Sequence, residues 1–222
     1  MRIHPEHIRR KHLTLRLSDS LYLALERYEE FKVSHLPVVS ANGKYLGLLS
    51  ETEVFGLYDA QKNIEDNQIP LQKDGVFETQ SVLDALKLIA ERSLTLLPVI
   101  DAEDNYLGYL LPLDVLKNIG NDTSFSEYGS LLSVKMSLRD YALNELSRIV
   151  ESEDALITAL FMEHLTDNDL ILVHIKINIP DASAVVAALE RHEYQVETLY
   201  QKSKLDEKLN ENFHSFLKYL NP

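Results

Sequence analysis

One stretch of nineteen residues occurs twice in this chain. The first copy, LPVVSANGKYLGLLSETEV, occupies residues 36–54, and the second, LPVIDAEDNYLGYLLPLDV, occupies residues 97–115. Nine positions are identical, and the alignment needs no gap. A repeat that keeps its register in this way predicts two units with the same fold. Because the sequence holds two copies rather than three or more, it favours a packed pair of domains over a solenoid.

The residues around each copy show the same order of local signals. An extended segment leads into a polar turn that can cap a helix, and the helix has apolar residues at helical spacing. A short apolar strand, a turn, a second strand and a closing helix follow. We therefore predict a β-α-β-β-α unit of about 60 residues, used twice. The first copy has a strand in 13–17, a helix from 21, strands 36–39 and 45–49 and a helix from 51, and the second copy has the same elements at 75–79, from 82, at 97–100, at 106–111 and from 112.

Each predicted unit has a three-stranded sheet with helices on one face only. A unit this small buries too little apolar surface to be stable alone. Packing the open faces of the two sheets together removes that problem, and it relates the copies by a pseudo-two-fold axis with clefts between the sheets. The predicted boundaries are residues 1–60 for the first repeat and 61–120 for the second.

The repeated pattern resembles the CBS domain. The resemblance is carried by a Pro-Val strand, a glycine in the next strand (Gly47 or Gly108) and an acid six residues after that glycine. Two copies in tandem resemble a CBS pair, or Bateman module, over roughly residues 8–120. The resemblance implies a regulatory module that binds an adenosine-containing ligand, such as AMP, ATP or S-adenosylmethionine, in the clefts between the sheets.

In that family, a hydroxyl three residues after the strand glycine helps to hold phosphate, and an aspartate six residues after it accepts hydrogen bonds from the two ribose hydroxyls. The first copy has Ser50 and Glu53 at these positions, and the second has Leu111 and Asp114. Glu53 is therefore one methylene longer than the family's aspartate, and Asp114 has no neighbouring hydroxyl to hold a phosphate. The resemblance implies a ligand site formed by Ser50, Glu53, Asp114, Pro37, Val38, Pro98 and Val99.

The same residues also have a purely structural interpretation. Ser50 and Thr52 suit the N-terminus of the closing helix, and the helix dipole favours an acid such as Glu53 in its first turn. Pro112 likewise suits the start of the second closing helix. On this interpretation the clefts are vestigial and are retained only for packing.

The second half of the chain has a different pattern. Residues 121–130 are polar and rich in turn formers, so they are a predicted linker. The order that follows is β-α-β-β-α-β, the split βαβ arrangement of ferredoxin-like domains, which makes the fold class of the whole chain α+β. The predicted elements are 131–136, 141–150, 156–163, 170–177, 179–192 and 194–199.

This element order, over about 70 residues, resembles the ACT domain. ACT domains often bind amino acids and usually dimerise through their sheets, so the resemblance implies a homodimer formed by residues 131–200. Their amino-acid site follows the first strand, where this chain has Arg139 and Asp140 but no glycine, and both can equally be ordinary surface residues. A CBS pair followed by an ACT-like domain is similar to bacterial acetoin-utilisation regulatory proteins.

Residues 201–222 predict an amphipathic helix, because apolar side chains recur along one face with charges opposite. An apolar face of this kind needs a partner, which leaves two alternatives open: the helix folds back on its own chain, or it contacts a second subunit. The apolar face consists of Leu205, Leu209, Phe213, Phe216, Leu217 and Leu220.

The composition excludes several classes of function. The 222 residues include no cysteine, which excludes disulfides, thiolate metal sites and cysteine nucleophiles. The formal net charge of −13 disfavours nucleic acid and anionic membranes as partners, and we interpret the basic run over residues 9–11 as a solvated leading segment. Neither a membrane-spanning stretch nor a signal peptide is found, so a cytoplasmic location is expected.

No enzymatic motif is found in the sequence. It contains no glycine-rich phosphate loop, no serine nucleophile elbow and no zinc-protease motif, so we predict a protein that is not an enzyme. Two histidine pairs, His164 with His174 and His4 with His7, have no third ligand at a suitable spacing, and we predict no metal site.

Two hypotheses from different classes remain. In the first, the protein senses an adenosine nucleotide in the clefts and transmits the signal through an ACT-like dimer; Ser50 and Asp114 favour it. In the second, both ligand sites have decayed and the protein acts as a structural interaction module; Leu111 and the missing glycine near Arg139 favour it. In either case the regulated partner is expected to be a separate protein.

Overall fold

The chain forms two compact units, Met1–Gly120 and Asn121–Pro222. The computed structural model describes residues 2–3, 5–9, 13–55, 59, 61–121, 124, 128–165 and 169–200. Each unit has its own hydrophobic core. The amphipathic helix predicted over residues 201–222 lies outside the described residues. Within those residues, no helix is long and apolar enough to cross a membrane.

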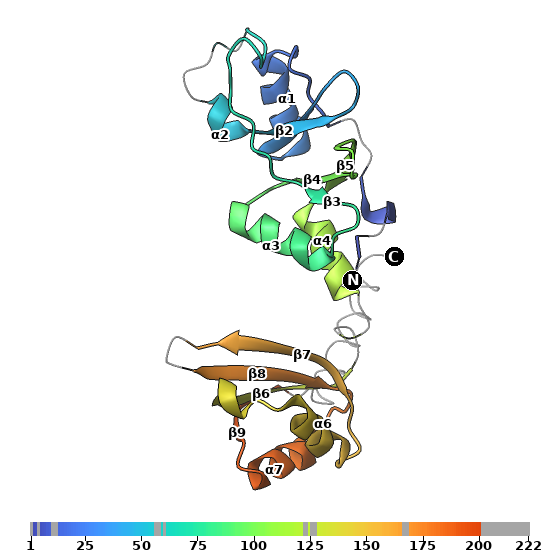
Figure 1. Cartoon of the computed structure of the whole chain (residues 1–222), viewed down its shortest axis with the longest axis vertical. Helices are drawn as coiled ribbons and strands as arrows, with labels where there is room; N and C mark the ends of the chain where they lie inside the picture. The colour runs from blue at the N-terminus through green and yellow to red at the C-terminus, as the bar shows by residue number, and fades with distance from the viewer. Residues whose placement is uncertain are drawn as a thin grey trace, which may run out of the picture. The chain divides into compact units, whose positions relative to one another are not determined.

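The first unit contains both copies of the repeat in the predicted order, after a short 3-10 helix, η1 (Pro5–His7). In each copy the helices cover one face of the sheet, and the two sheets lie between the two helical layers (Figure 1). The first copy consists of α1 (Leu21–Phe31), β1 (His35–Val39), β2 (Tyr45–Ser50) and α2 (Glu51–Val54). The second consists of β3 (Val76–Phe77), α3 (Val82–Arg92), β4 (Leu97–Ile100), β5 (Tyr106–Leu110) and α4 (Pro112–Gly120).

The leading strand predicted over residues 13–17 is reduced to a single bridge. Leu15 pairs with Val38 in parallel, as β3 pairs with β4 in the second copy. The pairing stops after Leu15 because a turn begins at Arg16, whose backbone N–H donates to the Asp19 carboxylate at 2.8 Å. The first copy therefore has a two-stranded sheet extended by one bridge, while the second has three strands.

The long helix of each copy begins at the predicted polar turn. Ser20 precedes α1 and accepts a hydrogen bond from the backbone N–H of Leu23. Ser81 precedes α3 and forms a reciprocal capping box with Asp84. These side chains satisfy backbone N–H groups that have no partner inside the helix, which explains why both helices start where they do.

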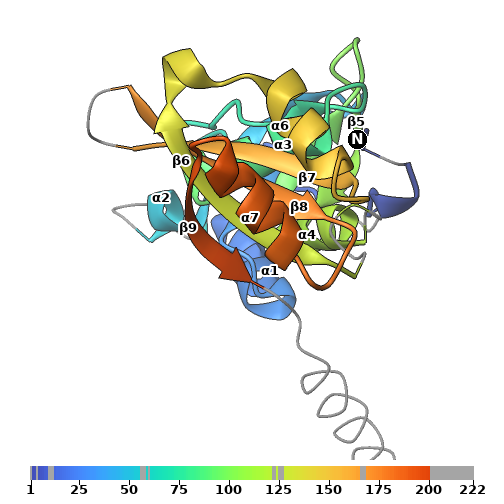
Figure 2. The same cartoon turned by 90° about the horizontal axis from the view of Figure 1, so that it is seen from below.

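The second unit has the predicted β-α-β-β-α-β order. Its four-stranded sheet has the antiparallel strand order β7-β8-β6-β9, which is that of ferredoxin-like folds. Figure 2 shows α7 lying across this sheet, and both α6 and α7 cover the same face in the two views. The elements are β6 (Ser130–Ser137), η2 (Leu138–Asp140), α6 (Leu143–Glu151), β7 (Ile157–His164), β8 (Leu170–Ile177), α7 (Ser183–Arg191) and β9 (Gln195–Tyr200).

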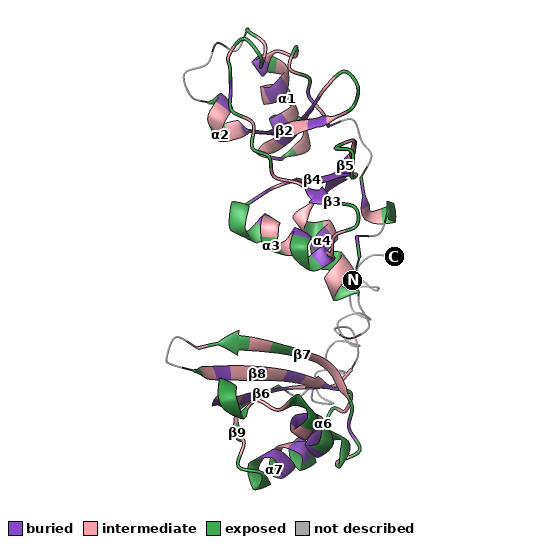
Figure 3. Cartoon of the chain, in the orientation of Figure 1, coloured by how far each residue is buried: buried purple, intermediate pink, exposed green. Residues whose placement is uncertain are grey.

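The two faces of this sheet differ in burial. Alternate residues of β6 and β8 point into the core beneath α6 and α7, with Val134, Val173 and Ile175 fully buried. The other face carries Phe161, which is 46% exposed, and half-buried His174. In Figure 3, β4 and β5 of the first unit are largely buried, whereas β7 is intermediate over most of its length and exposed toward its C-terminal end.

The two copies of the first unit meet at equivalent residues. The backbone N–H of Tyr45 donates to the carbonyl of Asp104, and the N–H of Tyr106 donates to the carbonyl of Gly43, at 2.8 and 3.0 Å. The rings of Tyr45 and Tyr106 stack with their centroids 6.5 Å apart. Contacts between equivalent residues are what a pseudo-two-fold axis produces, and a single hydrophobic core spans both copies.

Each copy also extends its sheet with a segment that leads into the other copy. Gln72 precedes the second copy but pairs with Leu48 of β2, and Arg9 precedes the first copy but pairs with Tyr109 of β5. In both pairs the two backbones exchange hydrogen bonds of 2.7–3.1 Å. We call this arrangement the strand exchange, and it links the copies in both directions.

Glycine makes the strand exchange possible. Gly47 and Gly108 have φ angles of +146° and +150°, in a region that side chains with a Cβ rarely adopt. A Cβ atom on Gly108 would lie 2.6 Å from the carbonyl oxygen of Arg9, and one on Gly47 would lie 2.8 Å from the carbonyl oxygen of Gln72. The glycine of each repeat therefore has a structural role, because the crossing backbone occupies the space beside it.

We expect Gly108→Ala to lower the free energy of unfolding by about 1–3 kcal/mol, through backbone strain and displacement of the crossing segment. Urea unfolding of the full chain measures this change. Gly120→Ala is the matched control, because nothing lies within 4 Å of its added Cβ. Equal effects of the two substitutions would contradict the role assigned to Gly108.

Candidate functional site

Asp114 lies where the strand exchange meets the closing helix of the second copy. It is in the first turn of α4, and its Oδ2 accepts a hydrogen bond from the backbone N–H of Leu111 at 3.1 Å. Arg9 donates from Nε to Oδ2 at 2.6 Å and from Nη2 to Oδ1 at 2.8 Å. The Asp114 side chain is 12% exposed and that of Arg9 is 42% exposed, so the carboxylate is the more enclosed partner.

This environment favours the ionised carboxylate. Hydrogen bonding from Arg9 lowers the pKa of Asp114 below its usual value; burial opposes this, and the Leu111 N–H adds to it. The same hydrogen bond raises the pKa of the Arg9 guanidinium. Asp114 is therefore a strong, negatively charged acceptor at neutral pH, which is the property needed to hold two hydroxyl groups.

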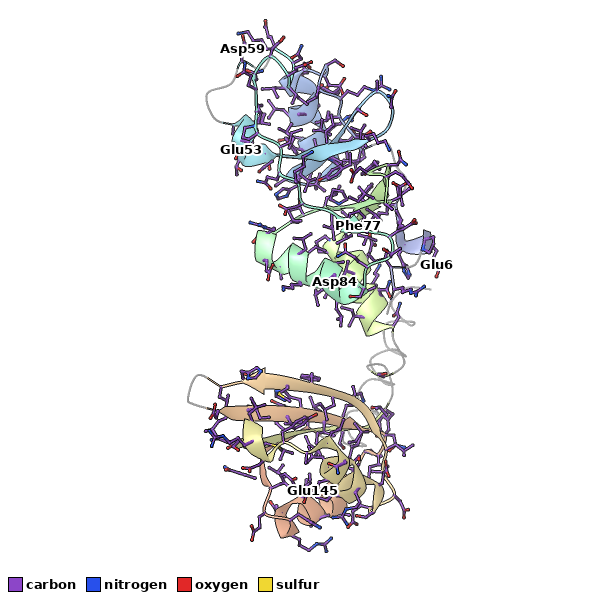
Figure 4. The ribbon with its side chains drawn as sticks, viewed as in Figure 1. Glu6, Glu53, Asp59, Phe77, Asp84 and Glu145 are labelled. Carbon is purple, nitrogen blue, oxygen red and sulfur yellow. The ribbon has the colours of Figure 1, made fainter. Side chains whose placement is uncertain are left out.

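Glu53 is the equivalent acid of the first copy, but its surroundings differ. It lies on the four-residue helix α2, where Figure 4 labels it, and its side chain is half-buried. The exchanged residue in this copy is Gln72, which carries no charge. Among the described residues Glu53 forms no hydrogen bond or ion pair, so its carboxylate has no competing cation.

Ser50 precedes α2 but does not cap it with its side chain. Its hydroxyl instead bonds the hydroxyl of Thr52 at 2.7 Å, and the residue is 5% exposed. The capping role that the sequence allowed for Ser50 is thus not observed. Either hydroxyl can be the donor, and if Thr52 donates, the Ser50 hydroxyl can still donate to a ligand.

The strand residues of the predicted site lie in the interior. Val38 and Val99 are fully buried and pair with Gly47 and Gly108 in the adjacent strands. Their side chains fill the core shared by the two copies. The neighbouring Pro37 and Pro98 are buried as well. In this structure these four residues therefore belong to the interior, and the polar groups of the predicted site are those of Ser50, Glu53 and Asp114.

Arg9 is the site residue that the sequence analysis missed. The sequence predicts a solvated segment over residues 9–11; Arg9 is indeed exposed, but it also forms an ion pair with Asp114 that the sequence does not indicate. Residues 10–12 lie outside the described residues. No local pattern links Arg9 to Asp114, which is 105 positions away. Arg9 and Asp114 could have been paired from the sequence only by assuming that each leading segment crosses to the other copy.

The candidate residues of the second unit are held by their neighbours. Arg139 forms an ion pair with Asp169 at 3.7 Å, and Asp140 accepts a hydrogen bond from the Ser137 hydroxyl at 2.7 Å. Both lie after β6, at the predicted place. Asp140 also borders a surface hollow that includes Glu145 and Tyr194.

The histidines of the second unit are not brought together as a metal site. Ser133 and Glu163 bond the two ring nitrogens of His174 at 2.9 and 3.2 Å, and His164 is exposed at the end of β7. Within the described part of the chain, no three histidine, aspartate or glutamate side chains gather as metal ligands would.

Comparison with known families agrees with this geometry. Residues 6–59 and 75–121 match the model of the CBS domain. The two matched segments coincide with the two copies in the first unit. The N-terminal unit therefore contains two CBS domains in tandem.

Two curated proteins of Methanocaldococcus jannaschii illustrate the sequence similarity. The chain is 28% identical over 107 residues to an inosine-5'-monophosphate dehydrogenase, which covers 47% of this chain and 21% of the relative. It is 24% identical over 135 residues to an uncharacterised protein, and this match covers 60% of this chain and 50% of the relative. The chain spans half or less of the length of these curated relatives.

Two solved structures are also similar. A CBS domain pair/ACT domain protein from Thermotoga maritima has a TM-score of 0.48 and 20% identity, covering 54% of this chain and 96% of that chain. The CBS-pair protein CBSX2 from Arabidopsis thaliana, in complex with AMP, has a TM-score of 0.46 and 25% identity, covering 54% and 96%.

We expect Asp114→Asn to remove an acid-sensitive part of the stability. The folded pKa of Asp114 is lowered, so its contribution is present above the unfolded pKa of about 4 and is lost as the pH falls through the folded value. At pH 7 the free energy of unfolding of the wild type should exceed that of Asp114→Asn by about 1 kcal/mol. The difference is no larger because the Arg9 side chain is partly exposed to solvent, which screens the ion pair.

Urea unfolding from pH 7 down to pH 3 measures the difference. Arg9→Gln and the double variant complete a cycle that isolates the Arg9–Asp114 interaction. A difference between wild type and Asp114→Asn that stays constant over this range would show that the ionised pair contributes nothing to folding.

Proposed function

We propose that the CBS pair binds an adenosine-containing nucleotide, such as AMP or ATP, or S-adenosylmethionine, and that Asp114 and Glu53 accept hydrogen bonds from its ribose hydroxyls. The observation that carries this proposal is the placement of an acid at the same position in both copies. Asp114 and Glu53 each lie in the first turn of a closing helix. For Asp114 the structure also shows an ionised and enclosed carboxylate, which suits a paired hydroxyl ligand.

The two positions are not equivalent. Beside Glu53, Ser50 offers a hydroxyl that can donate to a phosphate while it accepts a hydrogen bond from Thr52. Beside Asp114, the corresponding residue is Leu111, which offers only its backbone. We therefore propose that the position beside Glu53 has the more complete set of polar groups.

Binding would act as a signal only through a difference in affinity between two arrangements of the copies. The copies touch at Tyr45 and Tyr106 and through the strand exchange, and a ligand between them would change these contacts. We propose that the second unit, as an ACT-like dimerisation domain, passes this change to a separate protein in the cytoplasm. The proposed role is regulatory rather than enzymatic. The order of domains is similar to that of acetoin-utilisation regulatory proteins.

The structure also favours a second candidate function at one position. The bidentate bond from Arg9 satisfies both oxygens of Asp114 without any ligand. If that bond is permanent, the CBS pair is a structural interaction module with a decayed second site. Measuring ligand binding at each position separately distinguishes the nucleotide sensor from the structural module.

We expect full-length protein to bind AMP in isothermal titration calorimetry, and we expect Glu53→Ala combined with Asp114→Ala to abolish binding, because no carboxylate would hold the ribose. ATP, S-adenosylmethionine and the amino acids complete the panel. Glu30→Ala, an exposed acid on α1, is the matched control and should bind as wild type does. Binding that survives the double substitution would refute the ribose contacts, and no binding across the panel would favour the structural module.

We expect the protein to be a dimer that forms through the open face of the β7-β8-β6-β9 sheet. Phe161 stacks on His174 there, with ring centroids 4.8 Å apart, and a charge at its position would oppose burial of that face. Phe161→Glu should therefore lower the mass in light scattering from that of two chains to that of one chain of 25.4 kDa.

Leu143→Glu is the control for this experiment. Leu143 is 49% exposed on α6, which covers the opposite face of the sheet, so this substitution should leave the mass unchanged. A monomeric wild type, or a dimer that tolerates Phe161→Glu, would contradict the proposed interface.

A further inference from the structure

Arg9 occupies the atoms of Asp114 that a ribose would need. Its Nε and Nη2 atoms reach one carboxylate oxygen each, at 2.6 and 2.8 Å. Within the described residues, the carboxylate also accepts a hydrogen bond from the backbone N–H of Leu111. Two ribose hydroxyls can therefore reach Asp114 only after the guanidinium has moved away.

The position of Arg9 permits such a movement. Its backbone is fixed by two hydrogen bonds to Tyr109, at 2.9 and 3.1 Å. Its side chain is 42% exposed, compared with 12% for Asp114. The long side chain can thus swing toward solvent or toward a ligand while the strand exchange stays intact.

The charge of Arg9 decides which ligand can displace it. A neutral nucleoside would take the carboxylate and leave the guanidinium without its anion, so a charge-assisted bidentate bond would be lost. A nucleotide carries its own anion, and a guanidinium binds phosphate in the same two-pronged geometry as it binds carboxylate. With a nucleotide the cation exchanges one anionic partner for another.

The second copy lacks the side-chain hydroxyl that the first copy has for binding phosphate. Leu111 stands where the first copy has the hydroxyl of Ser50, so the second copy has no side chain of its own to hold a phosphate. Arg9 brings a cation to this position from outside that copy. The equivalent residue of the first copy is Gln72, which pairs with Leu48 as Arg9 pairs with Tyr109 and brings no charge.

We propose, on the basis of the proposed function, that Arg9 is the specificity-determining residue of the second position. It closes Asp114 to neutral nucleosides and binds the phosphate of a nucleotide whose ribose takes its place on the carboxylate. The first position, with Glu53 and Gln72, lacks this selection. The two positions of one CBS pair thus differ in ligand class, because only the second requires a phosphate.

Calorimetry with AMP and adenosine tests this inference when each position is studied alone. Glu53→Ala leaves the second position, and there AMP should bind at least roughly tenfold more tightly than adenosine. Adding Arg9→Gln should bring the two affinities together, by weakening AMP and by strengthening adenosine. Arg16→Gln, which replaces an exposed arginine in the same leading segment, is the matched control and should preserve the difference.

Two further variants keep the test decisive. If Arg9→Gln unfolds, Arg9→Lys retains the charge without the bidentate geometry and should reduce the preference for AMP. In protein that carries Asp114→Ala, only the first position remains, and Gln72→Arg should create a preference for AMP there by placing a cation opposite Glu53.

The outcomes separate this inference from the proposed function. If Glu53→Ala binds AMP and adenosine equally, or if Arg9→Gln leaves the preference unchanged, Arg9 does not select the ligand although the site is real. If neither wild type nor Glu53→Ala binds AMP, the proposed function and this inference both fall. A preference for AMP over adenosine that is lost with Arg9→Gln and kept with Arg16→Gln would establish Arg9 as the specificity-determining residue.

Discussion

The first unit depends on the strand exchange between its two copies. Each copy receives on its second strand the segment that leads into the other copy, through the backbone pairs of Leu48 with Gln72 and of Tyr109 with Arg9. The exchange requires close approach of two backbones, which only the glycines beside these pairs allow. Neither copy can complete its sheet alone, so the exchange and the shared core explain why the sequence carries the pattern twice.

The strand exchange also determines what the candidate site contains. It carries a residue from before the first copy to the closing helix of the second, and it carries Gln72 to the equivalent place in the first. The architecture is symmetric, but the exchanged side chains are not, since one is a cation and the other is neutral. Asp114 is bonded by a cation, whereas Glu53 has no hydrogen bond or ion pair within the described part of the chain. This difference arises from single residues on a common framework, and our proposal that the two positions differ in ligand rests on it.

The second unit applies another solution to a similar problem. Its four-stranded sheet is covered by α6 and α7 on one face, where alternate strand residues such as Val134 and Val173 are fully buried. The other face carries an aromatic side chain, Phe161, stacked on His174. In the first unit a second copy within the same chain covers the open sheet, whereas the second unit has no such repeat. That contrast is the physical basis of our proposal that the protein dimerises through this unit.

The sequence by itself determined the order of elements and the register of the repeat. Period, capping residues such as Ser20 and Ser81, and turn residues act over a few positions, so their effects can be read locally. The repeat likewise placed Glu53 and Asp114 at equivalent positions. Only the tertiary structure decided that Ser50 bonds Thr52 and that Arg9 covers Asp114. Those contacts depend on which surfaces meet after the copies pack, and no local pattern records a partner 105 positions away.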